Sequence, residues 1–410
     1  NPLMRPGTLP YGAPDFSKIK GEDYLPALKE GIRQQREEIA RIVADKAKPT
    51  FANTILAYEK SGLLLDRVSS IFFALVSADK TPEIEQEKEA VPLLTDFENE
   101  ISFNQRFFQR IKYVYDHERN TLKGEDRKLL EEVYKKFVRS GALLPEDKMA
   151  RMQQINKRIA ALQQEFGNML PKATNAAAVW VESEGELAGL GAADIAQCRK
   201  DAESRGGKAP YCIVITNTTQ QPILASLDNR ALRERVYRAS IHRADGSGDF
   251  NTFPIIAEMA HLRAEKARLM GFKDYASYSL DNAMAKNTDN TYRFLKQLIA
   301  AYTPKAQAET QAIEAYARCT MGPDFKLEPY DRFYYSAKMK KEQYSFSDDD
   351  VKPYFNIDSV LVNGVFYAAH RVYGLSFKQR TDLPTYHADM KVFDVLDKDG
   401  HQLALFYCDY

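Results

Sequence analysis

Six histidines are the first residues of this sequence that could hold a metal or move a proton: His117, His242, His261, His370, His387 and His401. No HExxH occurs, the helical spacing that places two imidazoles and a general-base glutamate on one face. The pattern most similar to this motif is Glu258, His261 and Glu265, which share one face of a predicted helix and could contact a metal. Because that helix supplies a single histidine, we interpret the group as a solvated face with intrahelical pairs to Arg263 and Lys266.

Three further patterns resemble motifs but lack the spacing that their chemistry needs. Residues 189–194 resemble a dinucleotide-binding loop, but Asp194 occupies the third glycine position, so we predict a loop that enters a helix. Residues 244–249 do not have the spacing of a nucleophile elbow and are predicted to form a turn. Residues 348–350 lack EF-hand spacing and indicate a helix start or a solvated loop.

Aromatic residues crowd one stretch of the second half: Tyr330, Phe333, Tyr334, Tyr335, Tyr344, Phe346, Tyr354 and Phe355. Such rings either form a core or line a cleft for an extended peptide, where they give contact area at a small entropic cost. We interpret the stretch mainly as core and keep the cleft wall as the alternative.

The elements of the first half are predicted to be long antiparallel helices that pack through their apolar faces. In residues 24–43, Leu25, Leu28, Ile32 and Ile39 recur at helical spacing between charged residues. Thr50 can cap a helix that starts near Phe51, and Gly62 interrupts the next turn. Further amphipathic segments are residues 63–77, 81–104, 104–120, 124–139 and 145–170.

After about residue 173 the pattern becomes mixed. Residues 179–181 and 211–215 are predicted strands, with a helix at 192–205 between them and residues 221–224 as the hairpin partner of the second strand. Helices are then predicted at 231–242, 255–270, 275–280, 291–318 and 351–373. Strands follow at Phe377, at 392–395 and at 403–410, with a hairpin turn at 397–400.

Composition excludes some partners and leaves the compartment open. The 57 basic and 57 acidic residues balance, which gives no reason to expect nucleic acid or an anionic membrane as partner. By its apolar runs, the sequence is predicted to contain no segment long enough to span a bilayer. The cysteines, Cys198, Cys212, Cys319 and Cys408, contain no CxxC pair, so neither a zinc knuckle nor a disulfide framework is indicated. Cytoplasm and periplasm both remain open.

The last eight residues, 403–410, are mostly apolar and aromatic and read as a strand without a polar tail. An apolar strand at the end of a chain needs partners to cover it. The sequence therefore predicts that the 410 residues are the front part of a longer protein.

Several stretches together form an ordered set of motifs. They are residues 14–16 with 22–27, 49–62 (PTFANTI followed by EKSG), 137–142 (FVRSGA), 262–272 (LRAEKARLMGF) with Tyr275, Tyr278 and Leu280, 330–335 (YDRFYY), 364–366, 373–374 and 403–410. In this order they resemble the M3 family of zinc metallopeptidases, the thimet oligopeptidase family, and within it the bacterial dipeptidyl carboxypeptidase branch. The resemblance covers essentially the whole chain. One departure is Tyr330, which stands where the family commonly has Trp.

The resemblance implies a mainly α, neurolysin-like fold with small β elements near residues 179–224 and 377–410. It implies that residues 1–224 form an N-terminal helical region with a β-hairpin insertion at about 179–224, and that 225–410 form the first part of the catalytic region. The intact enzyme would bind Zn²⁺ and cleave short unstructured peptides in a deep cleft. The zinc ligands and catalytic residues of the family have no counterpart in this chain, whose missing C-terminal catalytic portion would supply them. Tyr407, Asp409 and Tyr410 are the candidates for residues next to the substrate cleft.

Two alternatives to a dipeptidyl carboxypeptidase stay open at this point. One is an oligopeptidase of the same family, which cuts short peptides internally. The other is a natural non-catalytic paralogue that binds peptides. An exposed sheet edge near the end of the chain could bind an extended peptide by strand addition in any of the three cases.

Overall fold

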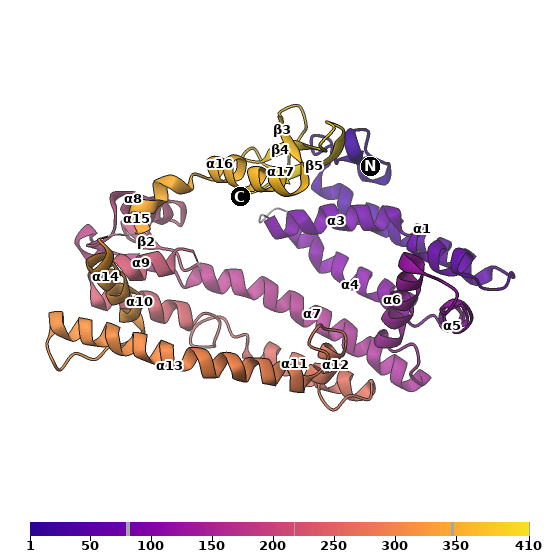
Figure 1. Cartoon of the computed structure of the whole chain (residues 1–410), viewed down its shortest axis with the longest axis horizontal. Coiled ribbons are helices and arrows are strands. Elements are labelled where there is room, and N and C mark those ends of the chain that lie inside the picture. Colours follow the sequence, from indigo (N-terminus) through magenta and orange to yellow (C-terminus); the bar gives the residue numbers. More distant parts are fainter. Residues whose placement is uncertain (79–82, 217, 346–347, 410) are drawn as a thin grey trace. The chain divides into compact units, whose positions relative to one another are not determined.

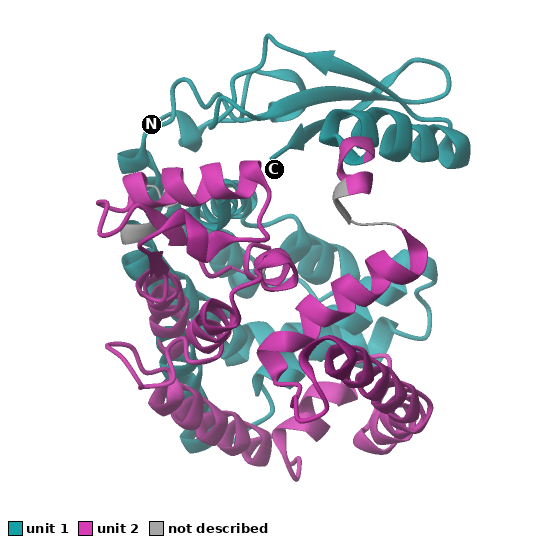
Figure 2. Ribbon diagram, turned by 90° about the vertical axis from the view of Figure 1, so that its left-hand side faces the viewer, with its two compact units in different colours: residues 1–161, 355–410 teal, residues 162–354 magenta. Residues whose placement is uncertain are grey.

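The computed structural model describes residues 1–78, 83–216, 218–345 and 348–409, and it divides into two compact units (Figures 1 and 2). Unit 1 comprises Asn1–Ala161 and Phe355–Tyr410, and unit 2 comprises Leu162–Tyr354. Both are mainly helical, as the sequence predicted, and the described strands form small antiparallel sheets. Neither unit begins or ends at residues 224 and 225, where the sequence predicts the border between the N-terminal helical region and the first part of the catalytic region. That predicted border separates two roles within the family, and it stays a prediction.

The helical part of unit 1 follows the segments predicted from apolar periodicity. Its elements are η1 (Pro2–Met4), η2 (Pro10–Gly12), η3 (Gly21–Asp23), α1 (Tyr24–Ala44), the π-helix η4 (Phe51–Leu56), α2 (Ala57–Glu59), α3 (Leu63–Ala78), α4 (Glu83–Ser102), α5 (Gln105–Glu118), α6 (Gly124–Ser140) and the first half of α7 (Glu146–Ala176). The predicted segment 81–104 begins partly outside the described residues.

Local signals set the boundaries of these helices. The Thr50 hydroxyl accepts a hydrogen bond from the Asn53 N–H at 3.2 Å, and the Asn53 side chain accepts one from the Thr50 N–H at 2.8 Å, which forms a capping box at the start of η4. Gly62 has φ +75°, a left-handed conformation that separates α2 from α3 as predicted. Its N–H donates to Glu38 at 2.8 Å.

The core of this part is rich in aromatic side chains. Phe107, Phe108 and Phe137 from α5 and α6 are almost completely buried and pack together with α1 and η4. The rings of Phe107 and Phe137 meet edge to face at 5.4 Å. Burial of such side chains stabilises a fold by roughly 1.5–3 kcal/mol each. This core fixes how α1, η4, α5 and α6 pack.

The stretch Phe51–Ala78 is long and apolar enough to cross a membrane by length and composition, which corrects the sequence-based expectation that no such run exists. In the structure it is interrupted at Gly62, and Ile55, Val68 and Phe72 within it are completely buried in unit 1. We therefore describe it as core helices of this unit.

The terminal part of unit 1 is a small helix-and-sheet layer. It comprises α16 (Ile357–Val360), the π-helix η8 (Leu361–Phe366), α17 (Tyr367–Tyr373), β3 (Ser376–Arg380), β4 (Lys391–Leu396) and β5 (Gln402–Cys408), with η7 (Lys352–Phe355) at the border. The helix predicted at 351–373 is confirmed in the main: residues 357–373 form one uninterrupted helical run that contains the π-helical stretch η8, and η7 precedes it as a short 3-10 helix. The predicted hairpin between β4 and β5 is confirmed.

Unit 2 contains the second half of α7 and a chain of shorter elements. They are β1 (Val179–Val181), η5 (Glu184–Leu187), α8 (Ala192–Ser204), β2 (Tyr211–Ile213), α9 (Gln220–Ser226), α10 (Arg230–Ile241), α11 (Phe253–Leu269), α12 (Tyr275–Asp281), α13 (Thr288–Met321), η6 (Pro329–Asp331), α14 (Arg332–Tyr344) and α15 (Asp348–Val351). Residues 189–194 lead into α8 and residues 348–350 lie in α15, as predicted for these two patterns.

The predicted hairpin partner at 221–224 is wrong. These residues belong to α9, and β2 instead pairs antiparallel with β1, with Val179 opposite Ile213, across the intervening α8. Pro222 explains the difference because it lacks an N–H for a strand ladder but is tolerated in the first turn of a helix. Leu224 then turns into the core around β1 and β2.

Candidate functional site

Of the predicted cleft residues, Tyr407 lies on the edge strand β5 and Asp409 follows that strand. The sheet in the terminal part of unit 1 has the order β3-β4-β5 and is antiparallel throughout, so β5 has a paired neighbour on one side only. The β4–β5 turn is held by Asp397, whose carboxylate accepts hydrogen bonds from the N–H groups of Asp399 and His401 at 2.8 and 2.9 Å. A register shift near Val395 and Leu396 bends the pair.

One face of this sheet is covered by η8 and α17. The Phe366 ring stacks on Phe377 with centroids 3.9 Å apart and meets Phe393 edge to face at 4.9 Å. Leu361 and Cys408 complete this small core. The alternation of a strand therefore points Cys408 inward and Tyr407 to the opposite face.

The opposite face carries an ionic network. Arg380 on β3 donates to Asp394 on β4 at 3.0 Å and to Asp382 at 2.7 Å. Gln402 on β5 donates to the same Asp394 at 2.6 Å. The hydrogen bonds from Arg380 lower the pKa of Asp382 to about 2. These contacts join all three strands and fix the position of β5.

The two described cleft candidates differ in environment. The Tyr407 hydroxyl is buried and has no hydrogen-bond partner among the described residues, and burial raises its pKa. Asp409 is exposed and accepts a hydrogen bond from the Tyr386 hydroxyl. Burial and this bond raise the pKa of Tyr386 to about 12. Tyr410, the third candidate, lies outside the described residues.

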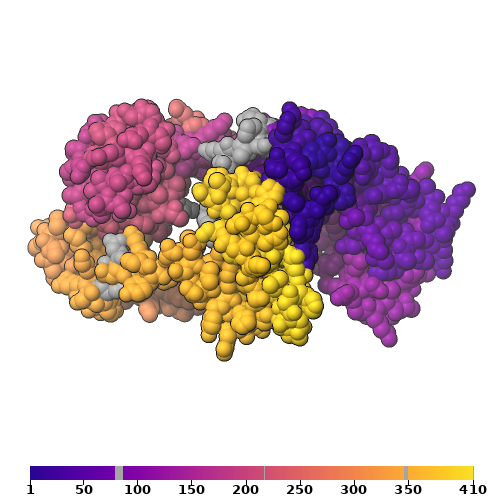
Figure 3. Space-filling model, turned by 90° about the horizontal axis from the view of Figure 1, so that it is seen from above, coloured from indigo at the N-terminus to yellow at the C-terminus, as the bar shows by residue number. Residues whose placement is uncertain are grey.

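The N-terminal segment lies beside the first residues of β5. The Tyr11 hydroxyl donates to the Gln402 carbonyl, and the rings of Phe16 and Tyr386 meet edge to face at 5.3 Å. Figure 3 shows the indigo N-terminal residues next to the yellow C-terminal ones. Beyond Gln402 no described strand pairs with the outer side of β5. This outer side offers main-chain donors and acceptors to an extended chain.

The described residues do not fit a catalytic zinc site. Among them, one set of His, Cys, Asp or Glu has ligand atoms within 4.8 Å of one another, namely Asp397, Asp399 and His401 in the exposed β4–β5 turn. It offers a single imidazole, and Asp397 already accepts two backbone hydrogen bonds, whereas catalytic zinc sites use three protein ligands and commonly two or more histidines. The Glu258, His261 and Glu265 face of α11 does not form such a set. No chemical step through zinc is derived from this chain.

The aromatic stretch divides between core and surface. Tyr334 and Tyr335 on α14 are buried and pack against Phe325 and Ile313, so the core interpretation holds for them. Tyr344, Tyr354 and Phe355 are between 65% and 80% exposed, so they are not core residues. Phe346 lies outside the described residues.

Next to this aromatic core, sequence analysis missed a buried ion cluster that ties α10 to η6. Asp331 is fully buried and contacts Arg230 at 2.7 Å and Arg233 at 2.9 Å. Burial raises the pKa of Asp331, but the hydrogen bonds from the two guanidinium groups outweigh it and lower the pKa below its usual value. The Arg233 guanidinium also lies 4.0 Å from the centroid of the Tyr334 ring. We assign the cluster a structural role because the buried Asp331 carboxylate is paired with both guanidinium groups and so links α10 to η6.

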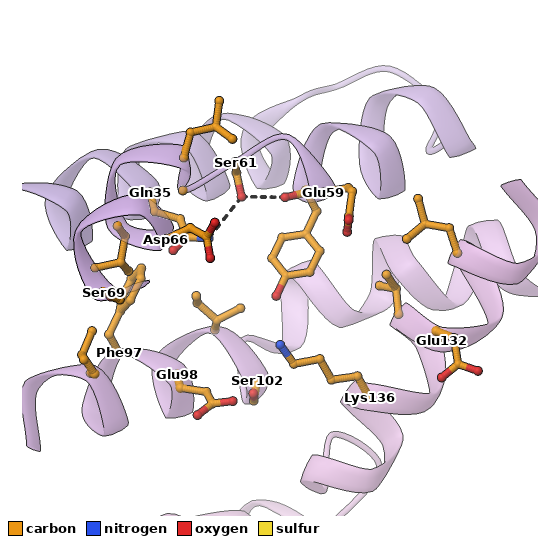
Figure 4. A pocket seen from close by; sticks show the side chains of 18 residues that line it. Gln35, Glu59, Ser61, Asp66, Ser69, Phe97, Glu98, Ser102, Glu132 and Lys136 are labelled. Carbon is orange, nitrogen blue, oxygen red and sulfur yellow. Dashed lines mark hydrogen bonds between the residues drawn. The ribbon is translucent and has the colours of Figure 1, made fainter. Parts of the chain in front are cut away.

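Unit 1 also holds a pocket of about 910 Å³ between α1, α3, α4 and α6 (Figure 4). Glu59, Asp66, Glu98 and Glu132 contribute carboxylates, and the Lys136 ammonium points into the space. Burial raises the pKa of Tyr58 in this pocket, and the hydrogen bond with Lys136 opposes that effect. Its described lining residues include no histidine or cysteine.

Comparison with known proteins gives a consistent result. Residues 223–410 match the model of peptidase family M3. The chain is 34% identical over 412 residues to the dipeptidyl carboxypeptidase of Escherichia coli (strain K12), a match that covers all of this chain and 60% of that protein. It is 31% identical over 415 residues to oligopeptidase A of the same organism, again covering 60% of it. A probable cytosolic oligopeptidase A of Arabidopsis thaliana is 25% identical over 423 residues. The chain thus spans about 60% of the length of these relatives.

Proposed function

The chain belongs to peptidase family M3, as its motifs indicated, and on that premise we propose that it is part of a zinc metallopeptidase that releases C-terminal dipeptides from short unstructured peptides. The observation that supports this most is the 34% identity to a dipeptidyl carboxypeptidase along the whole chain. In this proposal residues 1–224 are the front helical region, and 225–410 are the first part of the catalytic region.

The proposed division of labour follows from the chemistry of the residues present. This chain has no HExxH and no described group of side chains that fits catalytic zinc. The zinc ligands and the general base would therefore come from a further part of the polypeptide. The zinc ion held by that part would supply the activation of water for peptide hydrolysis.

The residues present would form scaffold and cleft wall. The outer side of β5 beyond Gln402 is suited to an extended substrate because main-chain hydrogen bonds fix register without demanding a particular sequence. Tyr407 and Asp409 on and after this strand are the residues that we propose to lie near the substrate, with Tyr410 next to them. A substrate segment held in this way must be extended, which excludes a segment that is part of a folded protein.

A second candidate function is an oligopeptidase that cuts short peptides internally. It is favoured by the 31% identity to oligopeptidase A over the whole chain. The two functions differ in one chemical requirement, since release of a dipeptide requires a group that recognises the free C-terminal carboxylate of the substrate.

The test uses the protein made from its complete reading frame, assayed beside the 410-residue chain. The substrate is an N-acetylated hexapeptide, offered with a free C-terminal carboxylate or with a C-terminal amide, and products are identified by mass spectrometry. We expect the complete protein to release dipeptides from the free acid, to leave the amide almost uncut and to lose activity with a zinc chelator. Internal cleavage of both peptides would establish the oligopeptidase instead. Absence of cleavage would contradict both.

The same assay defines the role of the 410 residues. We expect them alone to hold no stoichiometric zinc and to cleave neither peptide. Dipeptide release by the purified 410-residue chain, with one tightly bound zinc, would contradict the division of labour.

A further inference from the structure

The pocket between α1, α3, α4 and α6 has the size of a site for a small organic ligand, and every residue that lines it belongs to unit 1 (Figure 4). Its volume of about 910 Å³ lies within the range of about 300–1,000 Å³ that is typical of ligand pockets. Aliphatic and aromatic side chains form much of its lining, namely Tyr58, Leu63, Leu65, Leu94, Phe97, Ile101, Leu129 and Val133. Ligand sites combine such a lining with a few polar groups that select the ligand.

One wall of the pocket is a turn whose shape is fixed by hydrogen bonds. The Ser61 hydroxyl donates to the Tyr58 carbonyl at 2.7 Å and accepts from the Gln35 amide at 3.3 Å. The Gly62 N–H donates to Glu38 at 2.8 Å, and its φ of +75° favours glycine at this position. This wall is therefore formed before a ligand binds, which lowers the entropic cost of binding.

The charges that line the pocket are mostly negative. Glu59, Asp66, Glu98 and Glu132 contribute four carboxylates, against the single ammonium group of Lys136. The whole chain, in contrast, has a formal charge of zero. A cleft lined by one sign of charge raises the local concentration of ligands with the opposite sign.

Three of the four carboxylates are available to a ligand. Glu132 forms an ion pair with Lys128 on the same helix at 2.6 Å. Glu59, Asp66 and Glu98 make no ion pair with another residue that the structure describes. Their charges are balanced by solvent or by a bound cation.

The lysine of the pocket does not neutralise these carboxylates. Its side chain forms a hydrogen bond with the Tyr58 hydroxyl, which lowers the pKa of Tyr58 against the larger effect of burial. Within the described part of the chain, Lys136 has no ion pair with a carboxylate. The charge of Lys136 therefore opposes the binding of a cation without closing the pocket.

The spacing of the carboxylates does not suit a metal ion. Among the described residues, no three of the pocket's carboxylates have oxygens within 4.8 Å of one another. Glu59, Asp66 and Glu98 come from three separate helices, α2, α3 and α4. A ligand that contacts more than one of them must carry separated positive charges on a stem that packs against the apolar lining. Linear polyamines and the side chains of lysine-rich peptides share this chemistry.

We propose that this pocket, which we call the acidic pocket, binds flexible organic polycations with ammonium groups on alkyl stems, and that Glu59, Asp66 and Glu98 are the anionic contacts. The site is separate from the β5 edge and from peptide cleavage. It does not rest on the proposed function, because all of its lining residues lie in the described part of unit 1.

The test is calorimetric titration of the protein made from its complete reading frame with two polycations. One is spermidine, a linear polyamine. The other is an N-acetylated and amidated tripeptide of D-lysine, whose configuration protects it from cleavage. We expect saturable binding of at least one of them at low salt and weaker binding as the salt concentration rises. The corresponding tripeptide of D-glutamate should not bind.

Variants that neutralise one charge each assign the binding to the pocket. Glu59→Gln and Glu98→Gln should each weaken the binding of the polycation by about two- to fivefold, whereas Lys136→Gln should strengthen it by a similar factor. Glu125→Gln is the matched control, because Glu125 is an exposed carboxylate on α6 outside the pocket lining, and it should leave the affinity unchanged. All four side chains are exposed, so the variants should fold, which far-UV circular dichroism checks.

The opposite signs of these effects make the outcome decisive. Weaker binding in both carboxylate variants with tighter binding in Lys136→Gln would support the site. Preference for spermidine would then assign it to free polyamines, and preference for the D-lysine tripeptide to basic peptide segments. Absence of saturable binding of both probes up to about 1 mM would overturn the proposal. Equal affinities in wild type and the three pocket variants would overturn it as well.

Discussion

Two regions of unit 1 differ in how completely they bury their aromatic side chains. In the helical region, Phe107, Phe108 and Phe137 are almost completely buried and pack on each other. In the terminal region, Phe366 and Phe393 are buried, but Phe355, Tyr373 and Phe406 are between 39% and 74% exposed. The first region buries these side chains among the 410 residues, whereas the second leaves several apolar side chains exposed among the described residues. The difference separates a region with a closed core of its own from a region whose described residues bury only part of their aromatic side chains.

The largest expected effect tests this contrast with one substitution type in both regions. Phe137→Ala should destabilise unit 1 by about 3–5 kcal/mol because it opens a cavity in a dense aromatic core. Phe355→Ala should change stability by less than about 0.5 kcal/mol, since two thirds of that side chain is exposed. Urea unfolding followed by far-UV circular dichroism measures both. Similar losses for the two variants would contradict the contrast.

A second prediction extends the contrast between buried and exposed sites to charges. Asp331→Asn should cost about 3 kcal/mol because it leaves Arg230 and the buried Arg233 without their anion. The control Asp382→Asn removes a carboxylate from an exposed pair with Arg380 and should change little. Fluorescence of Trp180, the only tryptophan, reports unfolding of unit 2, which contains Asp331, and urea unfolding followed by far-UV circular dichroism measures the Asp382→Asn control in unit 1. An Asp331→Asn variant as stable as wild type would show that the cluster does not stabilise the packing of α10 against η6.

The same cluster predicts a pH dependence with a defined sign. The pKa of Asp331 in the folded chain is lowered relative to 3.8. Its contribution to the free energy of unfolding is therefore present above pH 3.8 and is lost as the pH falls through the lowered pKa. The stability difference between wild type and Asp331→Asn should shrink in that acidic range. A difference that grows with acidification would contradict the assignment.

A third prediction concerns the close packing of α1 against α3, and the expected change in stability is smaller. A Cβ at Gly31 on α1 would lie 2.8 Å from the Leu65 Cα on α3, so Gly31→Ala should cost about 1–3 kcal/mol. A Cβ added at Gly167 on α7 would have no described atom of another residue within 4 Å, so Gly167→Ala should stabilise its helix by up to about 1 kcal/mol. Thermal unfolding of the two variants gives the signs. A Gly31→Ala variant as stable as wild type would contradict the close approach of α1 and α3.

The smallest expected effect is in the terminal region. Tyr407→Phe removes a buried hydroxyl that has no partner among the described residues, so the 410-residue chain should keep its stability or gain up to about 1 kcal/mol. Urea unfolding of this variant beside wild type measures the change. A clear loss of stability would mean that the hydroxyl has a stabilising partner in this chain.

Much of the fold could be predicted because the relevant signals are local. Thr50 and Gly62 mark a helix start and a helix break by their own chemistry, and both predictions are confirmed. The short apolar run 221–224 could not be resolved by periodicity, since so short a segment fits a strand and a helix equally well. Its proline was the available signal, and it favours the first turn of α9.

The site was harder to predict than the fold because its contacts join distant parts of the sequence. Asp331 was noticed within a motif, but its pairing with Arg230 and Arg233 depends on how α10 packs against η6. The edge position of β5 could be anticipated from the hairpin turn, whereas the unpartnered Tyr407 hydroxyl could not.

The central proposal is that this chain, which spans about 60% of the length of the peptidases it resembles, is part of a longer peptidase. The most direct measurement is the intact mass, under denaturing conditions, of the protein made from its own gene. The account predicts a mass well above the 46.7 kDa of these 410 residues. A mass near 46.7 kDa would contradict it, because the protein would then consist of these 410 residues alone.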